Sequence, residues 1–421
     1  MMPQSDIPSW FSKCLKKLKN YEDELFNVPI MNPIFCNIID ISKFGVKIWH
    51  QILDKNQIKL LFADKIFEFS PSEYESIYSG ITNALQKYEM NSECAPTIEV
   101  NGFETRDEAA YLKILEYWFR EWVNPSPVMS ESYYVETYIY RPLQIILHNL
   151  LYLRIHLYGP EHETKCSFER KIWHHYPPYG EWPSDFEEAR SLFDVPDELN
   201  DQNIIVEENV IIKNQIDDAP IVFPSNATIL VNEDTKPGIT YVRVYSKKVD
   251  TALTYTYGNN LAYFLIVEAS CPNVPFNGVY DKLLRSINDA INSFLIYIAK
   301  DAMNISSRLE NLLKKLRWIA IFVAGIFSLM VIKLMDNYQL RICFPIGEAR
   351  VPEKPNNISD AIFLLSLFIH IKRIVNENLE ILKEIEKEIE RIKSGSAPLE
   401  EINSARNFLE KIEIDLSFRI N

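Results

Sequence analysis

The sequence predicts an α/β fold: a mixed sheet flanked by helices, with a helical region before it and a helical hairpin after it. Three observations favour this class. Residues 240–270 are rich in β-branched and aromatic residues, and so are 319–323 and 327–335. Apolar residues recur at helical spacing in 108–123 and 375–392. The chain is also long enough for two or three structural units.

Composition narrows the classes of function. Of 421 residues, 47% are apolar and 24% are charged, which is typical of soluble globular proteins. The 44 basic and 58 acidic side chains give a net charge of −14, so contacts with nucleic acid must come from local basic clusters. With 11 glycines, the chain has no glycine-rich cradle for phosphates, which excludes most large classes of nucleotide-dependent enzymes.

Compartment signals are weak but consistent. The first residues carry no basic stretch followed by an apolar run, and the six cysteines show no CxxC spacing. We therefore expect an intracellular protein, cytoplasmic or nuclear and not secreted. Residues 318–332 are uncharged, but as a helix they would reach about 22 Å. A bilayer core needs about 30 Å, so we expect buried strands and no membrane span.

Residues 1–124 are expected to form a helical N-terminal region. Pro71 and Glu73 mark a helix start, and residues 108–123 form a second amphipathic helix. The Asn-Pro-Ser-Pro run at 124–127 ends it and sets the first boundary.

Residues 125–350 are expected to hold the α/β domain. A long helix begins at the N-cap Ser130 and runs to 157, kinked or split by Pro142. Residues 159–237 lack sustained periodicity and form a long insertion with short strands. Further helices are expected at 281–300 and 306–316.

The strands of a central sheet follow at 319–323, 327–335 and 338–344. Residues 351–421 then predict a helical hairpin with a coiled-coil seam, whose second helix runs from about 399 to 412. Its simplest role is a packing or dimerisation arm.

Two acidic residues fall on neighbouring strands of a predicted hairpin. If the hairpin is centred on Asn259, Asp250 lies opposite Glu268, and the period of two places both on one face together with Ser270. Carboxylates this close repel unless a cation lies between them. A hard divalent ion such as Mg²⁺ would resolve the conflict and could activate water against a phosphodiester. The alternative for Glu268 is a buried carboxylate paired with a lysine or arginine.

The order of these elements resembles the PD-(D/E)XK nuclease-like superfamily, the restriction-endonuclease-like fold, over about residues 128–345. The stretches that carry the resemblance are SESYYV at 130–135, RP at 141–142, DTAL at 250–253 and VEASCP at 267–272. They are similar, more narrowly, to expanded nuclease-like families of fungi. The resemblance implies that Asp250 and Glu268 bind the catalytic metal and that Glu131 supports the site.

The chain departs from this family at one position. Active members carry a lysine two residues after the motif glutamate, and here that residue is Ser270. A serine brings no positive charge to the developing transition state. Lys247, Lys248 and Lys282 are the candidates to replace it or to contact the phosphate backbone.

These observations lead to two hypotheses of different classes. In the first, the chain is a nuclease-like module that binds or cleaves nucleic acid, with catalysis weakened by Ser270. In the second, it is a non-enzymatic structural or interaction protein that binds a protein partner, or a second copy, through its terminal helices. The net charge of −14 favours the second, because dedicated DNA binders are usually basic.

Overall fold

The chain divides into two units, residues 1–162 with 249–421 and residues 163–248, and the computed structural model describes part of each. The described residues are 38–43, 67–93, 96–100, 106–125, 130–151, 154–160, 162–164, 211–213, 220–222, 227–230, 241–244, 248–258, 260–270, 277–334, 341–398, 402–404 and 408. In the second unit they form two antiparallel pairs, β4 (Ile211–Lys213) with β5 (Pro220–Val222) and β6 (Ala227–Leu230) with β7 (Tyr241–Val244).

Seven strands of the first unit form one mixed sheet, in the order β1-β14-β13-β12-β10-β9-β2. Their bounds are β1 (Ile38–Asp40), β2 (Ile155–Tyr158), β9 (Thr251–Tyr257), β10 (Asn260–Ala269), β12 (Trp318–Val323), β13 (Ile326–Leu334) and β14 (Arg341–Arg350). β10 is parallel to β12 and β1 is parallel to β14, whereas the other neighbours are antiparallel. The predicted mixed α/β architecture is confirmed.

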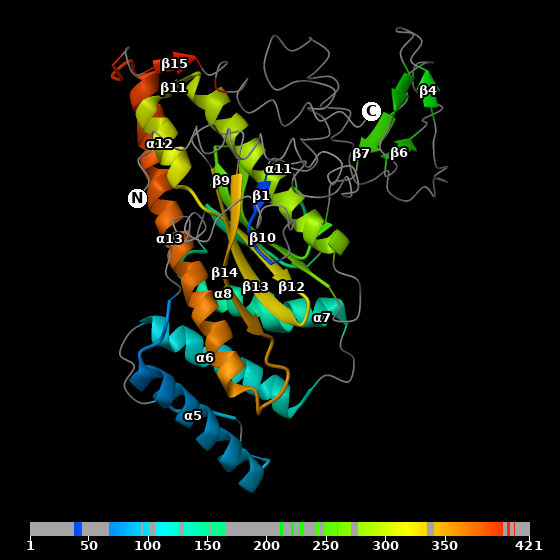
Figure 1. Ribbon diagram of the computed structural model, residues 1–421, viewed down its shortest axis with the longest axis vertical. Helices are drawn as coiled ribbons and strands as arrows, with labels where there is room; N and C mark the ends of the chain where they lie inside the picture. Colours follow the sequence, from blue (N-terminus) through cyan, green and yellow to red (C-terminus); the bar gives the residue numbers. More distant parts are fainter. Residues whose placement is uncertain are drawn as a thin grey trace, which may run out of the picture. The chain divides into compact units, whose positions relative to one another are not determined.

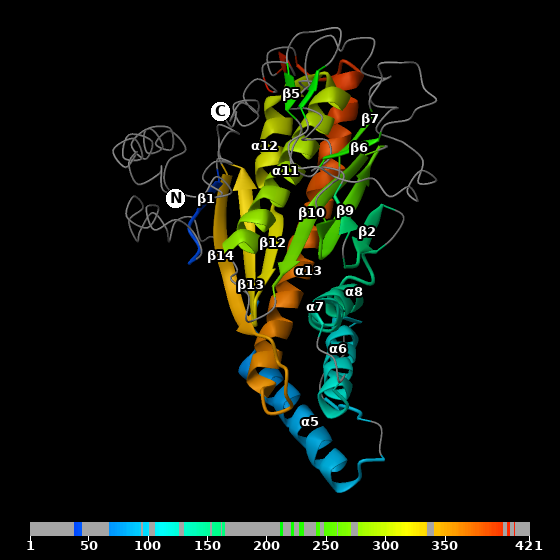
Figure 2. The ribbon, with the colours of Figure 1, turned by 90° about the vertical axis from the view of Figure 1, so that its right-hand side faces the viewer.

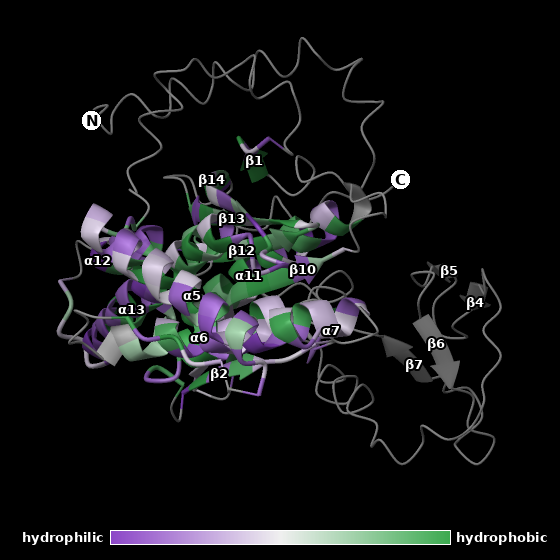
Figure 3. Cartoon of the chain, turned by 90° about the horizontal axis from the view of Figure 1, so that it is seen from below, coloured by the Kyte–Doolittle hydropathy of each residue, from purple (hydrophilic) through white to green (hydrophobic). Residues whose placement is uncertain are grey.

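Helices flank this sheet on both faces (Figures 1 and 2). α11 (Asn277–Ala302) covers one face, where Phe264 of β10 contacts Phe294 at 5.4 Å between ring centroids. α13 (Ile358–Lys393) covers the other, where Phe327 of β13 contacts Phe368 at 5.2 Å. The core therefore lies between the sheet and these two helices, and Figure 3 shows the apolar strands between helices with polar outer sides.

The antiparallel strands after α11 follow the sequence pattern closely. Short apolar runs are separated at Gly325, whose φ of +70° is readily adopted only by a residue without a Cβ. β12 and β13 occupy the two predicted runs to within one residue. No helix in the described residues is both long and apolar enough to cross a membrane, and the apolar run at 318–332 forms strands.

The helix predicted over 130–157, kinked or split by Pro142, is confirmed only as far as Ile146. The helix consists of α7 (Glu131–Val135), the π-helix η3 (Glu136–Tyr140) and α8 (Arg141–Ile146), and β2 follows. The π turn precedes Pro142, which has no N–H for an α-helical bond. The Arg141 N–H instead bonds to the carbonyl five residues back, so the chain continues as a helix without a break.

The N-terminal region is only partly helical. α5 (Pro71–Met90) begins at a capping box in which Ser70 and Glu73 satisfy each other's backbone N–H groups. α6 (Arg106–Val123) follows as predicted. However, residues 38–40 form strand β1, so the described part of this region also contains a strand.

The C-terminal region differs from the predicted hairpin. α13 ends in a Schellman motif, in which Gly395 has a φ of +70° and Ser396 N bonds to Arg391 O at 3.1 Å. The chain then forms β15 (Ile402–Ser404), which pairs with β11 (Asn304–Ser306), where a second helix was expected. The apolar positions Leu382, Ile385, Ile389 and Ile392, expected to form a coiled-coil seam, are buried within this chain.

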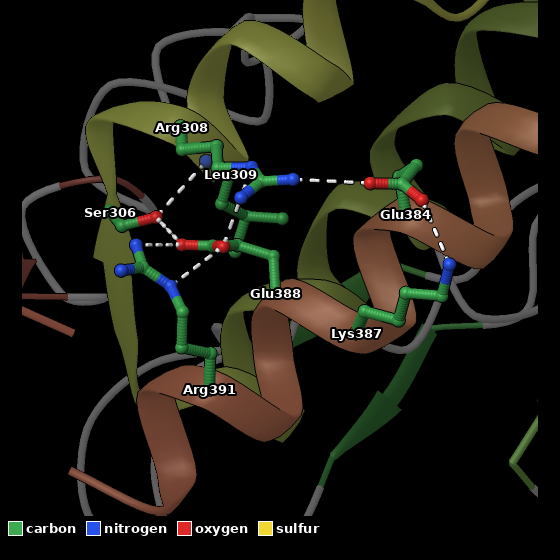
Figure 4. A network of polar contacts seen from close by, with 7 residues as sticks. All are labelled: Ser306, Arg308, Leu309, Glu384, Lys387, Glu388 and Arg391. Atoms are coloured by element: carbon green, nitrogen blue, oxygen red, sulfur yellow. Dashed lines mark hydrogen bonds and ion pairs between the residues drawn. The ribbon is translucent and has the colours of Figure 1, made fainter. Parts of the chain in front are cut away.

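A polar network joins α13 to α12 (Ser307–Lys315) (Figure 4). Glu388 is 2% exposed and accepts hydrogen bonds from Ser306 Oγ at 2.7 Å and from Arg391 Nη2 at 2.7 Å. The same Ser306 oxygen accepts from Leu309 N at 3.0 Å and so caps α12. The network fixes the start of α12 on the C-terminal half of α13.

Candidate functional site

The candidate site lies at the end of the β9–β10 hairpin. The hairpin was predicted with Asn259 at its centre, but Tyr257 pairs with Asn260, one residue away from that register. An extra residue between Tyr263 and Leu265 makes a β-bulge and shifts the pairing by one. Beyond the bulge, Leu253 pairs with Leu265 as predicted.

The shifted register brings Asp250 beside Glu268. Thr251 pairs with Val267, so the next position along each strand places the two acidic residues across from each other. Asp250 N donates to Val267 O at 3.1 Å, and Asp250 Oδ2 accepts from Ala269 N at 2.5 Å. These two bonds flank Glu268 and hold the Asp250 carboxylate at the end of the strand.

The two carboxylates have different surroundings. Glu268 is 1% exposed, whereas Asp250 is half-buried and so reachable from solvent. Glu268 Oε2 accepts a hydrogen bond from Lys282 Nζ at 2.8 Å. The lysine side chain is 36% exposed and comes from α11, which packs on β10. The paired carboxylate foreseen as the alternative for Glu268 is therefore present.

Ser270 continues the sheet and does not contribute a charge. It is 4% exposed, and its N–H donates to Val323 O on β12 at 2.8 Å. The positive charge beside Glu268 belongs to Lys282 of α11. The ammonium group approaches Glu268 from the helix and not from the strand itself.

The remaining predicted residues do not complete a metal site. Glu131 is exposed in the first turn of α7, after the cap at Ser130. Over the described ranges, no three acidic, histidine or cysteine side chains are placed to hold a metal ion together, so Glu131 does not form a triad with the two strand carboxylates. Lys248 is exposed on β8 (Lys248–Val249), and Lys247 lies outside the described residues.

Two acidic residues near the start of α11, Asp281 and Asp40, were not predicted from the sequence. Burial raises the pKa of Asp281 to about 6, partly offset by the charge of Arg285. Asp40, at the end of β1, accepts from Tyr280 Oη at 2.7 Å and from Ser42 N at 2.9 Å. Burial raises its pKa as well, despite these bonds. The available signal was an acidic residue directly after the apolar pair Ile38-Ile39, the same pattern that marked Glu268.

No protein-family model, no curated protein and no solved structure is significantly similar to the chain.

Proposed function

We propose that the chain is a nuclease-like module whose site, built on Asp250, Glu268 and Lys282, hydrolyses phosphodiester bonds with a divalent metal. The observation that carries the proposal is the Lys282 ammonium, 2.8 Å from a buried carboxylate whose neighbour across the strands is a second carboxylate. Phosphoryl transfer needs positive charge beside the developing negative charge, and Ser270 cannot provide it.

The order of elements supports the same proposal. A helix with an early glutamate (α7) is followed by β2, by β9 after an aspartate, and by β10 ending in Glu-x-Ser. Helix α11 and strand β12 come next, with β12 parallel to β10. This is the order in which the PD-(D/E)XK-like resemblance places its parts.

The donor set is compatible with Mg²⁺. This ion commonly binds through one or two carboxylates, while waters and substrate phosphates fill its other positions. Asp250 and Glu268 would supply two hard oxygen ligands at one strand end, with no third acidic side chain required. When bound, the ion would lower the pKa of a coordinated water and polarise the phosphate.

The protein side chains would perform separate tasks. The backbone N–H of Ala269 holds Asp250 in place, so the carboxylate does not have to be ordered when substrate binds. Lys282 reaches solvent with part of its side chain, so its ammonium group can contact both Glu268 and an incoming phosphate oxygen. Water attacks phosphorus and gives up a proton, the phosphorus–oxygen bond to the leaving strand breaks, and the released oxygen takes up a proton.

A cleavage assay tests the proposal. The full chain is incubated with Mg²⁺ and with single- and double-stranded DNA and RNA. We expect Asp250→Asn, Glu268→Gln and Lys282→Met each to lower the rate by about 100-fold or more. Lys282→Arg should retain part of the rate, because the charge remains. Glu93→Gln, an exposed acid between α5 and α6, is the matched control and should cleave normally.

Absence of cleavage with every substrate, or wild-type cleavage by Asp250→Asn, would overturn the proposal. The second candidate function, a non-enzymatic interaction protein, would then stand. It is favoured by the net charge of −14 and by the closed Glu268–Lys282 pair, since buried ion pairs also occur as purely structural features.

A further inference from the structure

The exposed aromatic side chains of the described residues gather on two helices. Large hydrophobic side chains with more than a third of their surface exposed include three aromatic ones: Tyr74 at 37%, Tyr78 at 44% and Phe363 at 42%. The first two lie one turn apart on α5, and the third lies in the second turn of α13. We call these three residues the aromatic patch.

Contacts between the helices make the patch one surface. Tyr74 Oη donates to Ser359 Oγ at 3.0 Å, which joins the start of α5 to the start of α13. Ser359 and Phe363 are four residues apart and therefore lie on one side of α13. The rings of Tyr74 and Tyr78 are nearly parallel, with 15° between their planes and 6.3 Å between their centroids.

The inner side of α5 already packs within the molecule. Ile77, Ile81 and Ala84 are buried, whereas Tyr74 and Tyr78 are exposed on the same helix. The exposed part of each ring contributes nothing to the fold through burial. Rings that are ordered, adjacent and exposed are typical of binding surfaces.

Acidic side chains lie beside the patch on both helices. Glu75, next to Tyr74, is exposed, and Asp360 follows Ser359 in the first turn of α13. The only basic residue of α5 is Lys87, more than two turns beyond Tyr78, and α13 has no lysine or arginine before Lys372. Lys354 is exposed in the loop before α13, whereas Glu75 and Asp360 each lie three residues before a ring of the patch, Tyr78 and Phe363. An approaching phosphate backbone would be repelled here, whereas a cation would be attracted both to the carboxylates and to the ring faces.

We propose that the aromatic patch binds an arginine-bearing segment of a partner protein. A guanidinium group stacks on tyrosine and phenylalanine faces while it pairs with carboxylates, and it keeps its charge at any physiological pH. The patch and its acidic border match both properties. This inference is independent of the proposed phosphodiester hydrolysis, because none of its residues belongs to that site.

The test is a titration of the full chain with a labelled, unstructured peptide of alternating arginine and glycine, read by fluorescence anisotropy. We expect saturable binding that weakens as salt is added. Tyr78→Ala and Phe363→Ala should each weaken binding about two- to five-fold, as loss of one exposed cation–π contact implies. Tyr78→Phe keeps the ring and should bind like the wild type, whereas Glu75→Lys should weaken binding.

Met90→Ala is the matched control, because Met90 is 87% exposed on the same helix but outside the patch. A peptide with glutamate in place of arginine should not bind. Equal binding by the wild type and by the Tyr78→Ala/Phe363→Ala double variant would overturn the proposal. A lack of peptide binding at low salt would also overturn it. The same holds if the double variant alters self-association of the chain but leaves peptide binding unchanged.

Discussion

Replacing Glu388 by alanine removes the carboxylate that joins α13 to α12. Glu388 is buried, and Ser306, Arg391 and Arg308 all point their donors at it, the last at 3.6 Å (Figure 4). Burial raises the pKa of Glu388, but the hydrogen bonds from Arg391 and Ser306 outweigh burial, and the net shift is downward. The ionised form is therefore the one that stabilises the fold.

The expected loss follows from these contacts. A hydrogen bond to a charged group contributes about 1.5–3 kcal/mol, and a buried donor that loses its acceptor costs about 1–3 kcal/mol. Ser306 is fully buried and would lose its acceptor, whereas Arg391 and Arg308 are 29% and 55% exposed and can turn to water. We expect Glu388→Ala to lower the free energy of unfolding by about 3 kcal/mol.

Urea denaturation of the full chain, followed by circular dichroism, measures this loss. The matched control is Glu384→Ala, one turn earlier on α13, which removes exposed pairs with Arg308 at 3.1 Å and Lys387 at 2.9 Å. Exposed pairs are solvated and screened, so this change should cost much less. If both variants lose the same stability, burial is not the reason for the strength of the network, and the reasoning fails.

Repeating the urea denaturation at different pH values tests which form of Glu388 stabilises the fold. Because the pKa of Glu388 is lower in the folded state, its contribution is complete above its ordinary value of 4.5 and is lost as pH falls through the folded value. The stability difference between the wild type and Glu388→Gln should therefore shrink below about pH 4.5. A difference that stays constant down to pH 3 would contradict the assignment of the ionised form.

Three further changes test other parts of the fold. Asp281→Asn should stabilise the chain by about 1 kcal/mol at pH 7, after allowance for solvent screening. The raised pKa of Asp281 means that the folded chain disfavours its ionised form, so the gain should appear between pH 3.8 and about 6, and urea denaturation across this range checks it. Gly80→Ala should lower the free energy of unfolding by about 1–2 kcal/mol although alanine has the better helix propensity, because the new Cβ would lie 2.8 Å from Glu99 O. An unchanged or higher Tm in a thermal melt would contradict this. Ser306→Ala should lower the free energy of unfolding by about 2–3 kcal/mol, against about 1 kcal/mol for Ser130→Ala at an exposed helix cap. Equal losses in urea denaturation would show that the bond from Ser306 to Glu388 adds nothing to its role as a helix cap.

The sheet was predictable where local sequence decides the structure. β12 and β13 are short apolar runs separated at Gly325, so composition alone located them. β1 and β15 could not be found in this way, because each has three residues and pairs with a strand far away in the chain. β2 was predicted as part of a helix because no glycine or proline separates its four residues from the apolar segment before them.

The pairing of Asp250 with Glu268 was predicted correctly because two departures from the expected hairpin offset each other. Next to the turn the strand pairing is one residue away from the expected register, and the bulge before Leu265 restores the register on which Asp250 and Glu268 depend. One extra residue inside a strand leaves no sequence signal. Lys282 was one of three candidate lysines, and only the packing of α11 on β10 distinguishes it from Lys248.

The pairing of β1 with β14 has a consequence for synthesis of the chain on the ribosome. Ile38 pairs with Arg341, so about three hundred residues must emerge before the earliest described strand finds its neighbour. Contacts that distant form slowly, because a long loop must close first. Until then Ile38 and Ile39, which are 1% exposed in the folded chain, lack the neighbouring strand beside which they are buried. This interval is the one in which a chaperone would be needed most.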